Sequence, residues 1–318
     1  MPAILTHYTF ALKAIPEDLV PFRAVVNLGT QGPDTFMAYG TVPWRKRKDP
    51  KKIRGWGHAM HNLPVESVYL PMMDYTKGKE DEDVLYAYID GILMHYCLDR
   101  LMHAYIFYRS GVDENGKLSG YYGWSHGAFE ALLDKILAKR EGTYGPLYKC
   151  ILTPEEQVKA ISKMWAACAP TPLGEDDFYD SYVDFIGAEK LLYTPLGLKR
   201  PVFYLLGKYS TPWAQSHPRS IKKYEAMDVL NDGLAPWHNP ATNELHNESV
   251  MELFGQALKD YEEVHRLVLD HKAGKDISKA FAKWTLNLDH EGGPVGMKKS
   301  HYDLCWKVLG KKKYLPKQ

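Results

Sequence analysis

Three side chains spaced four residues apart, His95, Asp99 and His103, give the sharpest chemical signal in the 318-residue sequence. On an α-helix, positions i, i+4 and i+8 drift by about 40° per step, so all three project from one stripe. Two imidazoles and a carboxylate are ligand types of Zn²⁺ and similar divalent ions. His95 and His103 would lie about 12 Å apart along the axis, at a rise of ~1.5 Å per residue. The spacing therefore predicts two or more metal ions along the stripe, with Asp99 nearest the His95 ion and His103 reaching another.

A second pair, His126 and Glu130, has the same i, i+4 spacing on a predicted helix. A helix hairpin closed by residues 110–120 would lay this pair beside His103. Two facing helices that carry histidines and carboxylates are an established way to build a metal cluster inside a bundle. A single histidine on an apolar face is more often a core residue than a ligand. The set as a whole favours a metal site, because six of the 13 histidines fall between residues 7 and 126.

Further candidate ligands lie upstream of the stripe. Asp34 follows Gly32 and Pro33, His58 and His61 stand three residues apart, and His7 lies near the N-terminus. His58 and His61 compete for one role. The Met-His context favours His61, and both remain open.

The elements that must position these residues are predicted to be helices. Residues 84–108 are apolar and aromatic without proline, which predicts a long buried helix. Cap and composition signals predict further helices, at about 124–140, from Thr153 onward, at 176–192, and near 219–231, 247–273 and 276–285. The fold class is all-α, a multi-helix metal-binding bundle with additional C-terminal helices. The predicted division is a metal-binding helical domain of residues 1–145 and a C-terminal helical region of residues 146–318, with packing as one unit as the alternative.

Composition excludes several other classes. A net charge of +1 argues against a dedicated nucleic-acid binder, and 45% hydrophobic residues are ordinary for a globular protein. No run approaches the ~18 apolar residues of a membrane span. The four scattered cysteines, Cys97, Cys150, Cys168 and Cys305, suit reduced thiols better than a disulfide framework. With no signal peptide recognisable, we expect a cytoplasmic protein without an integral membrane segment.

Three other features are expected to be structural. The basic connector of residues 41–54 is expected to be a solvated loop, with the rim of an anion-binding cleft as the alternative. Residues 237–240, WHNP, are expected to form a turn with a packing role, and closure over the site is the alternative. His265 and His271 are expected at the surface, because neither has a carboxylate at useful spacing. The terminal lysines 311–313 are expected to be solvated.

Several ordered blocks resemble the zinc-dependent phospholipase C family, and more closely its uncharacterised bacterial members. These blocks are THY (6–8), LGTQGPDTF (28–36), MH (60–61), HYCLDRLMH (95–103) and HGAFE (126–130). The similarity covers roughly the first 140 residues, and MDVLNDGLAPWHNP (227–240) with NESVMELF (247–254) extends it. The resemblance implies an all-α fold with three zinc ions in a cleft that hydrolyses phosphodiesters.

The resemblance also implies a distribution of ligands. It assigns a first ion to Asp34, His61, His95 and Asp99, and a second ion to His103, His126 and Glu130. A third ion would use His7 and share Asp99, which makes that carboxylate a bridge. Asp34 also matches the residue proposed as general base in the family.

The expected function is therefore a phosphoric ester hydrolase with two or three Zn²⁺ ions that activate water. Its partner would be a phosphate-ester substrate, either a phospholipid headgroup or a nucleotide, and no obligate protein partner is inferred. One alternative is a phosphodiesterase of the same fold acting on nucleotides or single-stranded nucleic acid. The other is a non-catalytic helical protein that binds metal.

Overall fold

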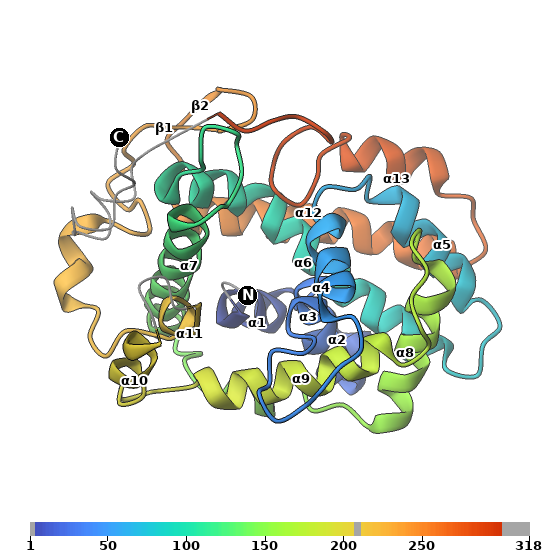
Figure 1. The fold of residues 1–318 in the computed structure, drawn as a ribbon. Helices are drawn as coiled ribbons and strands as arrows, with labels where there is room; N and C mark the ends of the chain where they lie inside the picture. The colour runs from blue at the N-terminus through green and yellow to red at the C-terminus, as the bar shows by residue number, and fades with distance from the viewer. Residues whose placement is uncertain (1–3, 207–210, 301–318) are drawn as a thin grey trace.

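The computed structural model describes residues 4–206 and 211–300, and in this part of the chain helices dominate (Figure 1). The α-helices are α1 (Ile4–Ala14), α2 (Arg23–Gly29), α3 (Asp34–Met37), α4 (Pro50–Met60), α5 (Glu66–Thr76), α6 (Glu82–Ser110), α7 (Tyr121–Arg140), α8 (Glu155–Cys168), α9 (Asp177–Leu192), α10 (Arg200–Leu205), α11 (Thr211–Gln215), α12 (Val250–Lys272) and α13 (Ser278–Thr285). Three 3-10 helices are η1 (Glu17–Phe22), η2 (Leu147–Lys149) and η3 (Lys222–Met227), and one hairpin pairs β1 (Trp237–His238) with β2 (Leu245–His246). The predicted all-α class is confirmed.

Helix α6 is the central element of the fold. It spans 29 residues, of which 24 are buried, because its sequence is apolar on every side rather than on one stripe. Helices α1, α2, α5, α7 and α12 all pack against it. The long buried helix predicted over residues 84–108 is confirmed. A helix enclosed in this way holds any polar stripe it carries away from bulk water.

Helices α2 and α6 cross at unusually short distance, and two glycines permit the contact. A Cβ atom added at Gly29 would lie 2.4 Å from the carbonyl oxygen of Tyr88 and 2.8 Å from Cα of Gly91. A Cβ atom at Gly91 would lie 2.5 Å from the carbonyl oxygen of Val26. No side chain fits at either position, so the two backbones meet directly. This crossing places the residues that follow α2 against the middle of α6.

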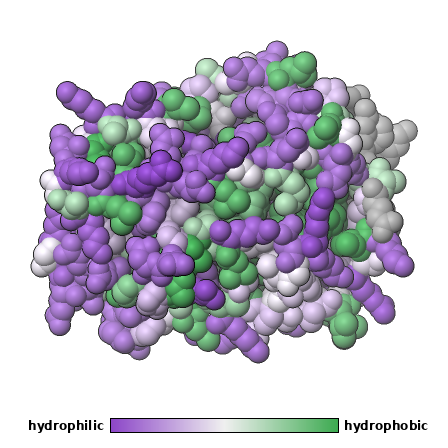
Figure 2. Space-filling view, turned by 180° about the vertical axis from the view of Figure 1, so that it is seen from behind, coloured by the Kyte–Doolittle hydropathy of each residue, from purple (hydrophilic) through white to green (hydrophobic). Residues whose placement is uncertain are grey.

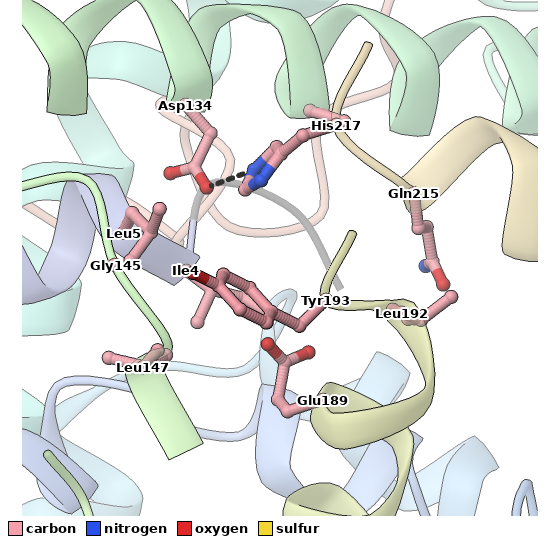
Figure 3. Close-up of a pocket in the computed structure, with 11 residues that line it drawn as sticks. Ile4, Leu5, Asp134, Gly145, Leu147, Glu189, Leu192, Tyr193, Gln215 and His217 are labelled. Carbon is pink, nitrogen blue, oxygen red and sulfur yellow. Dashed lines mark hydrogen bonds and ion pairs between the residues drawn. The ribbon is translucent and has the colours of Figure 1, made fainter. Parts of the chain in front are cut away.

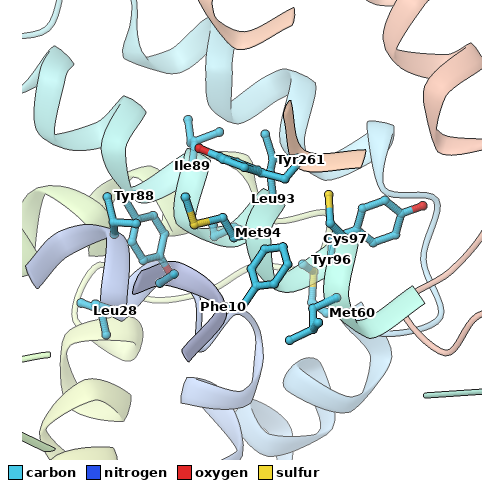
Figure 4. Packing of buried hydrophobic residues seen from close by; sticks show 14 of the residues in the cluster. Phe10, Leu28, Met60, Tyr88, Ile89, Leu93, Met94, Tyr96, Cys97 and Tyr261 are labelled. Carbon is cyan, nitrogen blue, oxygen red and sulfur yellow. The ribbon is translucent and has the colours of Figure 1, made fainter. Parts of the chain in front are cut away.

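One continuous hydrophobic cluster connects most of the helices, and a smaller one joins α7 to α11. The larger cluster runs from Leu5 in α1 to Trp284 in α13, so residues before and after position 145 contribute to the same core. Around α6, Phe10, Leu28 and Tyr261 come from three other helices and pack on its side chains (Figure 4). The division at residue 145 stays a prediction.

The helices predicted near 247–273 and 276–285 form as α12 and α13. Helix α12 begins after Ser249, whose side chain forms a reciprocal capping box with Glu252. The helix predicted near 219–231 is wrong, since only the 3-10 helix η3 forms there. Asp228 and Asn231 adopt positive φ angles of 41° and 54°, which an α-helix cannot contain.

His265 and His271 are not surface residues, which corrects the prediction made for them. His271 is buried, with Nδ1 2.9 Å from the hydroxyl of Tyr86 and Nε2 3.0 Å from Asp74 Oδ1. His265 Nδ1 lies 2.8 Å from Oδ1 of the buried Asp90. Their partners come from α5 and α6, so no local spacing could reveal them.

The basic connector and the WHNP segment also have defined structures. The loop prediction fails from Pro50 onward, where α4 begins, and Arg47 forms ion pairs with Asp184 and Asp180 of α9. Trp237 is buried, and its indole N–H donates to the carbonyl of Glu248 at 3.1 Å, which fits the packing role. These interactions hold both segments against the rest of the fold.

No helix in the described residues is long and apolar enough to cross a membrane. Hydrophilic side chains cover much of the face seen in Figure 2, with hydrophobic groups between them. Cys97, Cys150 and Cys168 are free thiols, as predicted. Cys305 and the lysines at 311–313 lie outside the described residues.

Candidate metal centre

The stripe on α6 places one carboxylate between two imidazoles. His95, Asp99 and His103 are all buried. Asp99 Oδ2 lies 2.9 Å from His95 Nε2 and 3.4 Å from His103 Nδ1. The helix therefore presents three potential ligand groups in a line, sheltered from solvent.

Helix α7 adds a second His–carboxylate pair beside the end of this stripe. Glu130 Oε1 lies 2.9 Å from His126 Nε2 and 3.3 Å from His103 Nε2, and Glu130 has no exposed surface. The hairpin formed by α6, residues 111–120 and α7 thus brings three candidate ligands together, two imidazoles and one carboxylate, in the arrangement expected from the sequence. His103, His126 and Glu130 form one candidate metal-binding group.

A second group forms where the short helices α3 and α4 approach α6. Asp34 is the first residue of α3, and His61 follows the last residue of α4. His61 Nε2 lies 3.4 Å from Asp34 Oδ1, and these two residues with His95 form a candidate group. His58 is exposed, one helical turn before His61. Of the two histidines that the sequence left open, the structure therefore brings His61 into the centre.

Helix α1 supplies the third group. His7 Nε2 lies 3.1 Å from Asp99 Oδ1, and the His7 ring stacks on His95 with centroids 4.3 Å apart. His7, His95 and Asp99 form the group. The two oxygens of Asp99 thus face different neighbours, Oδ1 toward His7 and Oδ2 toward His95. Because Oδ2 also lies 3.4 Å from His103 Nδ1, Asp99 contacts two of the three groups and could be shared between two ions.

The histidine rings are held by their Nδ1 atoms. Nδ1 donates to a backbone carbonyl in His61 (Gly57, 2.9 Å), His95 (Thr30, 3.1 Å) and His103 (His290, 3.0 Å). A carbonyl oxygen can only accept, so each Nδ1 carries the hydrogen, and the neutral ring has its lone pair on Nε2. In each ring, Nε2 lies within 3.4 Å of a carboxylate oxygen, and in His103 Nδ1 also lies 3.4 Å from Asp99 Oδ2. His126 Nδ1 lies 3.2 Å from the hydroxyl of Ser110, a group that can donate or accept, while Nε2 faces Glu130.

The loop after α2 fixes His95 from a second direction. Gly32 has a φ of +50°, and a Cβ atom there would lie 2.4 Å from His95 Cδ2. Only glycine accommodates both the backbone angle and the ring. The Gly29–Gly91 crossing and Gly32 together press this loop against the imidazole.

The charges of the centre are strongly coupled. Burial opposes the ionised form of Asp99, but the nearby imidazoles of His103, His95 and His7 hold its pKa well below the usual range. Burial likewise opposes protonation of His103, yet Asp99 and Glu130 raise its pKa to about 10. His95 differs, because burial lowers its pKa. The centre thus favours negative carboxylates that need positive charge beside them.

The donor atoms fit a divalent metal in type and spacing. No hydrogen bond satisfies His95 Nε2, Asp99 Oδ2 or either oxygen of Glu130, although all are buried. The Nε2–carboxylate distances above are 2.9–3.4 Å within the three groups. Neighbouring ligands on a tetrahedral Zn²⁺ ion would be roughly 3.3 Å apart, given bonds of ~2.0–2.1 Å. A cation between these atoms would satisfy all of them, so the three groups could hold metal ions.

The structure adds one histidine that the sequence did not single out. His290 follows Asp289 in a Gly-rich segment after α13, and its ring centroid lies 5.4 Å from His61 and 5.5 Å from His95. It has no i, i+4 carboxylate partner. The only local signal is a histidine between two acids before paired glycines, LDHEGG.

A separate pocket of about 30 Å³ lies between α1, α7 and α9, lined by Asp134, Glu189, Tyr193 and His217, among others (Figure 3). His217 Nε2 contacts Asp134 Oδ2 at 3.0 Å, while Thr6 donates to the other oxygen through its backbone N–H at 2.6 Å. Burial, with a contribution from the charge of Asp134, raises the pKa of Glu189 to about 8. This shift favours the protonated form of Glu189 at neutral pH.

Glu189→Gln is expected to change how stability depends on pH. Between pH 4.5 and 8 the folded wild type retains a proton that the unfolded chain releases, so its free energy of unfolding falls as pH rises. The fall is at most about 1.4 kcal/mol per pH unit, and the amide removes it. Between pH 5 and pH 8, the free energy of unfolding measured with urea should therefore fall less in the variant than in the wild type. The exposed Glu262, changed to Gln, is the control, and an equal response of both variants would contradict the assignment.

No family model, curated protein or solved structure matches the chain. The resemblance to the zinc-dependent phospholipases C therefore stays a prediction. The evidence for a metal centre is the geometry of the three groups.

Proposed function

We propose that the protein is a zinc-dependent phosphoric ester hydrolase, similar to phospholipase C, that uses a multinuclear centre to activate water. The observation that carries this proposal is the orientation of the histidines. In His61, His95 and His103, Nδ1 donates to a backbone carbonyl, which leaves Nε2 pointing toward a buried carboxylate. These carboxylates are Asp34, Asp99 and Glu130. An Nε2 atom about 3 Å from a carboxylate oxygen is stabilised by a cation between the two, either a proton or a metal ion, and one divalent ion can serve several such pairs at once.

The donor set supports zinc, and the number of groups supports hydrolysis. Imidazole nitrogen and carboxylate oxygen at tetrahedral spacing suit Zn²⁺, whereas Mg²⁺ and Ca²⁺ prefer oxygen ligands alone. Bound zinc ions would lower the pKa of water toward ~7 and stabilise negative charge on the phosphoryl group. A phosphodiester is an anion that repels hydroxide, so a cluster of cations suits it better than a single general base.

The chain's own residues have distinct roles in this proposal. Asp34, ionised because the imidazole of His61 overcomes burial and lowers its pKa, would orient the attacking water and accept its proton. Asp99 would be a ligand shared between two of the groups. A cavity of about 10 Å³ among His7, Asp34, Asp99, His103 and Glu130, with other lining residues, has room for about one water molecule.

The size of this cavity also favours a second candidate function. A structural metal site is closed by protein ligands, while a catalytic site keeps one position open. A cavity of about 10 Å³ would suit a non-catalytic protein in which the metal cluster stabilises the fold. Turnover distinguishes the two candidates.

The test combines metal analysis with turnover. The purified protein should contain at least two zinc equivalents per chain and hydrolyse a bis-aryl phosphate in a chelator-sensitive way. His95→Ala and His126→Ala should each lower zinc content and reduce the rate by about 10²-fold or more, since each removes a ligand from a different group. His58→Ala is the matched control, because His58 is exposed on α4 near His61.

The outcomes separate the candidates. Zinc without hydrolysis would support the structural centre, and full zinc retention in both alanine variants would refute the ligand assignment. Comparing a choline phospholipid with short single-stranded DNA then tests the substrate class.

A further inference from the structure

The segment after α13 enters the metal centre from the far end of the described chain. A β-bridge joins Leu288 to Pro294, and the hydroxyl of Tyr96 on α6 donates to the Leu288 carbonyl at 2.9 Å. The amide of Asn239 donates to the Gly292 carbonyl at 2.9 Å. A Cβ atom at Gly292 would lie 2.6 Å from the carbonyl of Arg100, so the segment lies directly on α6. These contacts fix residue 290 over the stripe.

The backbone of His290 already takes part in the centre. Its N–H donates to the carbonyl of His61 at 3.1 Å, and its carbonyl accepts the Nδ1 hydrogen of His103 at 3.0 Å. Residue 290 thus connects histidines of two different groups. Its side chain is 1% exposed and lies among the same rings.

The imidazole of His290 presents a free nitrogen to the candidate ligands. Its Nε2 lies 3.0 Å from the hydroxyl of Tyr69, which is buried on α5. Its Nδ1 is buried without a hydrogen-bond partner and lies 3.9 Å from Asp99 Oδ2. His61 Nε2 stands 4.0 Å from the same oxygen. Nδ1 of His290 therefore approaches the bridging carboxylate as closely as a ring already placed in the centre.

The rings of His61, His95 and His290 are mutual neighbours. Their centroids are separated by 5.4, 5.5 and 6.1 Å. Three imidazoles bound to one tetrahedral Zn²⁺ ion would have centroids about 5 Å apart, given bonds of ~2.0–2.1 Å. Tyr69 supplies the outer contact that ligating histidines usually make through their second nitrogen. His290 has the same arrangement as its neighbours with the roles of the two nitrogens exchanged.

We propose that His290 is a further metal ligand, binding through Nδ1 the ion that His61 and His95 share. This inference rests on the proposed metal centre and adds a ligand from the C-terminal segment to a set otherwise drawn from residues 7–130. With the carboxylate of Asp34, the three imidazoles would make four ligands for this ion, the number a tetrahedral Zn²⁺ takes. The loop that carries His290 would be closed onto α6 by the metal as well as by its hydrogen bonds.

The test measures metal binding rather than turnover. In His290→Gln the amide can keep a contact with Tyr69, but no donor remains at the Nδ1 position. Competition with a chromophoric chelator should show one zinc equivalent weakened by more than about 100-fold, beyond the 10–100-fold that loss of an outer partner typically causes. Cobalt loaded in place of zinc should show an altered d–d absorption spectrum. His271→Gln is the matched control, because His271 is also buried and contacts the hydroxyl of Tyr86 at 2.9 Å.

A second variant keeps the test decisive if His290→Gln fails to fold. Tyr69→Phe leaves the imidazole in place but removes its outer contact, and should weaken the same equivalent by about 10–100-fold. Wild-type zinc affinity and an unchanged cobalt spectrum in a folded His290→Gln protein would overturn this inference alone. Failure of the wild type to bind any metal would overturn both the inference and the proposed function.

Discussion

Asp99→Asn is expected to have the largest effect of any single substitution on the metal centre. The substitution should remove at least one zinc equivalent, weaken another, and lower phosphodiester hydrolysis on the order of 10³-fold, the upper range for losing one preorganised electrostatic group. Asn has nearly the same shape, so the loss would come from charge and not from packing. Zinc content and turnover are measured on the same sample.

The reason lies in the position of Asp99 between groups. Its Oδ1 lies 3.1 Å from His7 Nε2, and its Oδ2 lies 2.9 Å from His95 Nε2 and 3.4 Å from Nδ1 of His103, which belongs to another group. Glu130, by contrast, contacts two histidines of one group. Removing the charge of Asp99 therefore affects two proposed ions, whereas Glu130→Gln should affect one.

A matched control stands on the same helix. Asp90 is 2% exposed on α6 and pairs with His265, away from the three groups. Asp90→Asn should alter stability while leaving zinc content unchanged. If Asp99→Asn retains all its zinc, or if Asp90→Asn loses as much, Asp99 is not a bridge.

The sequence predicted the helices of the centre well because their signals are local. The run from 84 to 108 is apolar throughout, and α6 spans Glu82–Ser110. The i, i+4 spacings of His95–Asp99 and His126–Glu130 depend only on helical geometry, which is the same in every helix. Predicting that the two pairs lie close together needed one further assumption, that a short loop joins the two helices as an antiparallel hairpin.

The residues that were missed or wrongly placed depend on contacts between distant parts of the chain. His290 reaches the centre because Tyr96 holds its segment to α6 and Asn239 holds it to the β1–β2 hairpin. His271 was expected at the surface, but its partners Tyr86 and Asp74 lie almost 200 residues earlier. A lone histidine carries no periodic signal, so its environment follows from tertiary packing.

Side-chain exposure distinguishes His58 from His61 as candidate ligands, a choice that their spacing in the sequence left open. His58 and His61 are both on or next to α4, and their neighbours in sequence are similar in character. The side of α4 that faces α3 determines which of them is buried. His61 is 6% exposed and contacts Asp34, while His58 faces solvent.

Removing metal is expected to destabilise the whole fold and not only the centre. Five histidines and three carboxylates of the proposed ligand set are buried on α1, α3, α6 and α7 and just after α4, so bound ions would link these elements. A ligand present at 1,000 times its Kd stabilises the folded state by about 4.1 kcal/mol per site. At about 2 °C per kcal/mol for a chain of this size, one site alone raises Tm by roughly 8 °C.

Differential scanning calorimetry of the zinc-loaded and chelator-treated protein measures this difference. The double variant His95→Ala/His126→Ala is the control, because it lacks a ligand in each of the three groups and should show almost no response to zinc. Without metal, like-charged Asp34 and Asp99 must be balanced by protonated imidazoles such as His61, whose pKa is raised by Asp34 against the effect of burial. Protons supply charge without holding the helices in one geometry, so the metal-free protein should melt earlier. Identical melting with and without zinc would show that these groups are satisfied by protons alone.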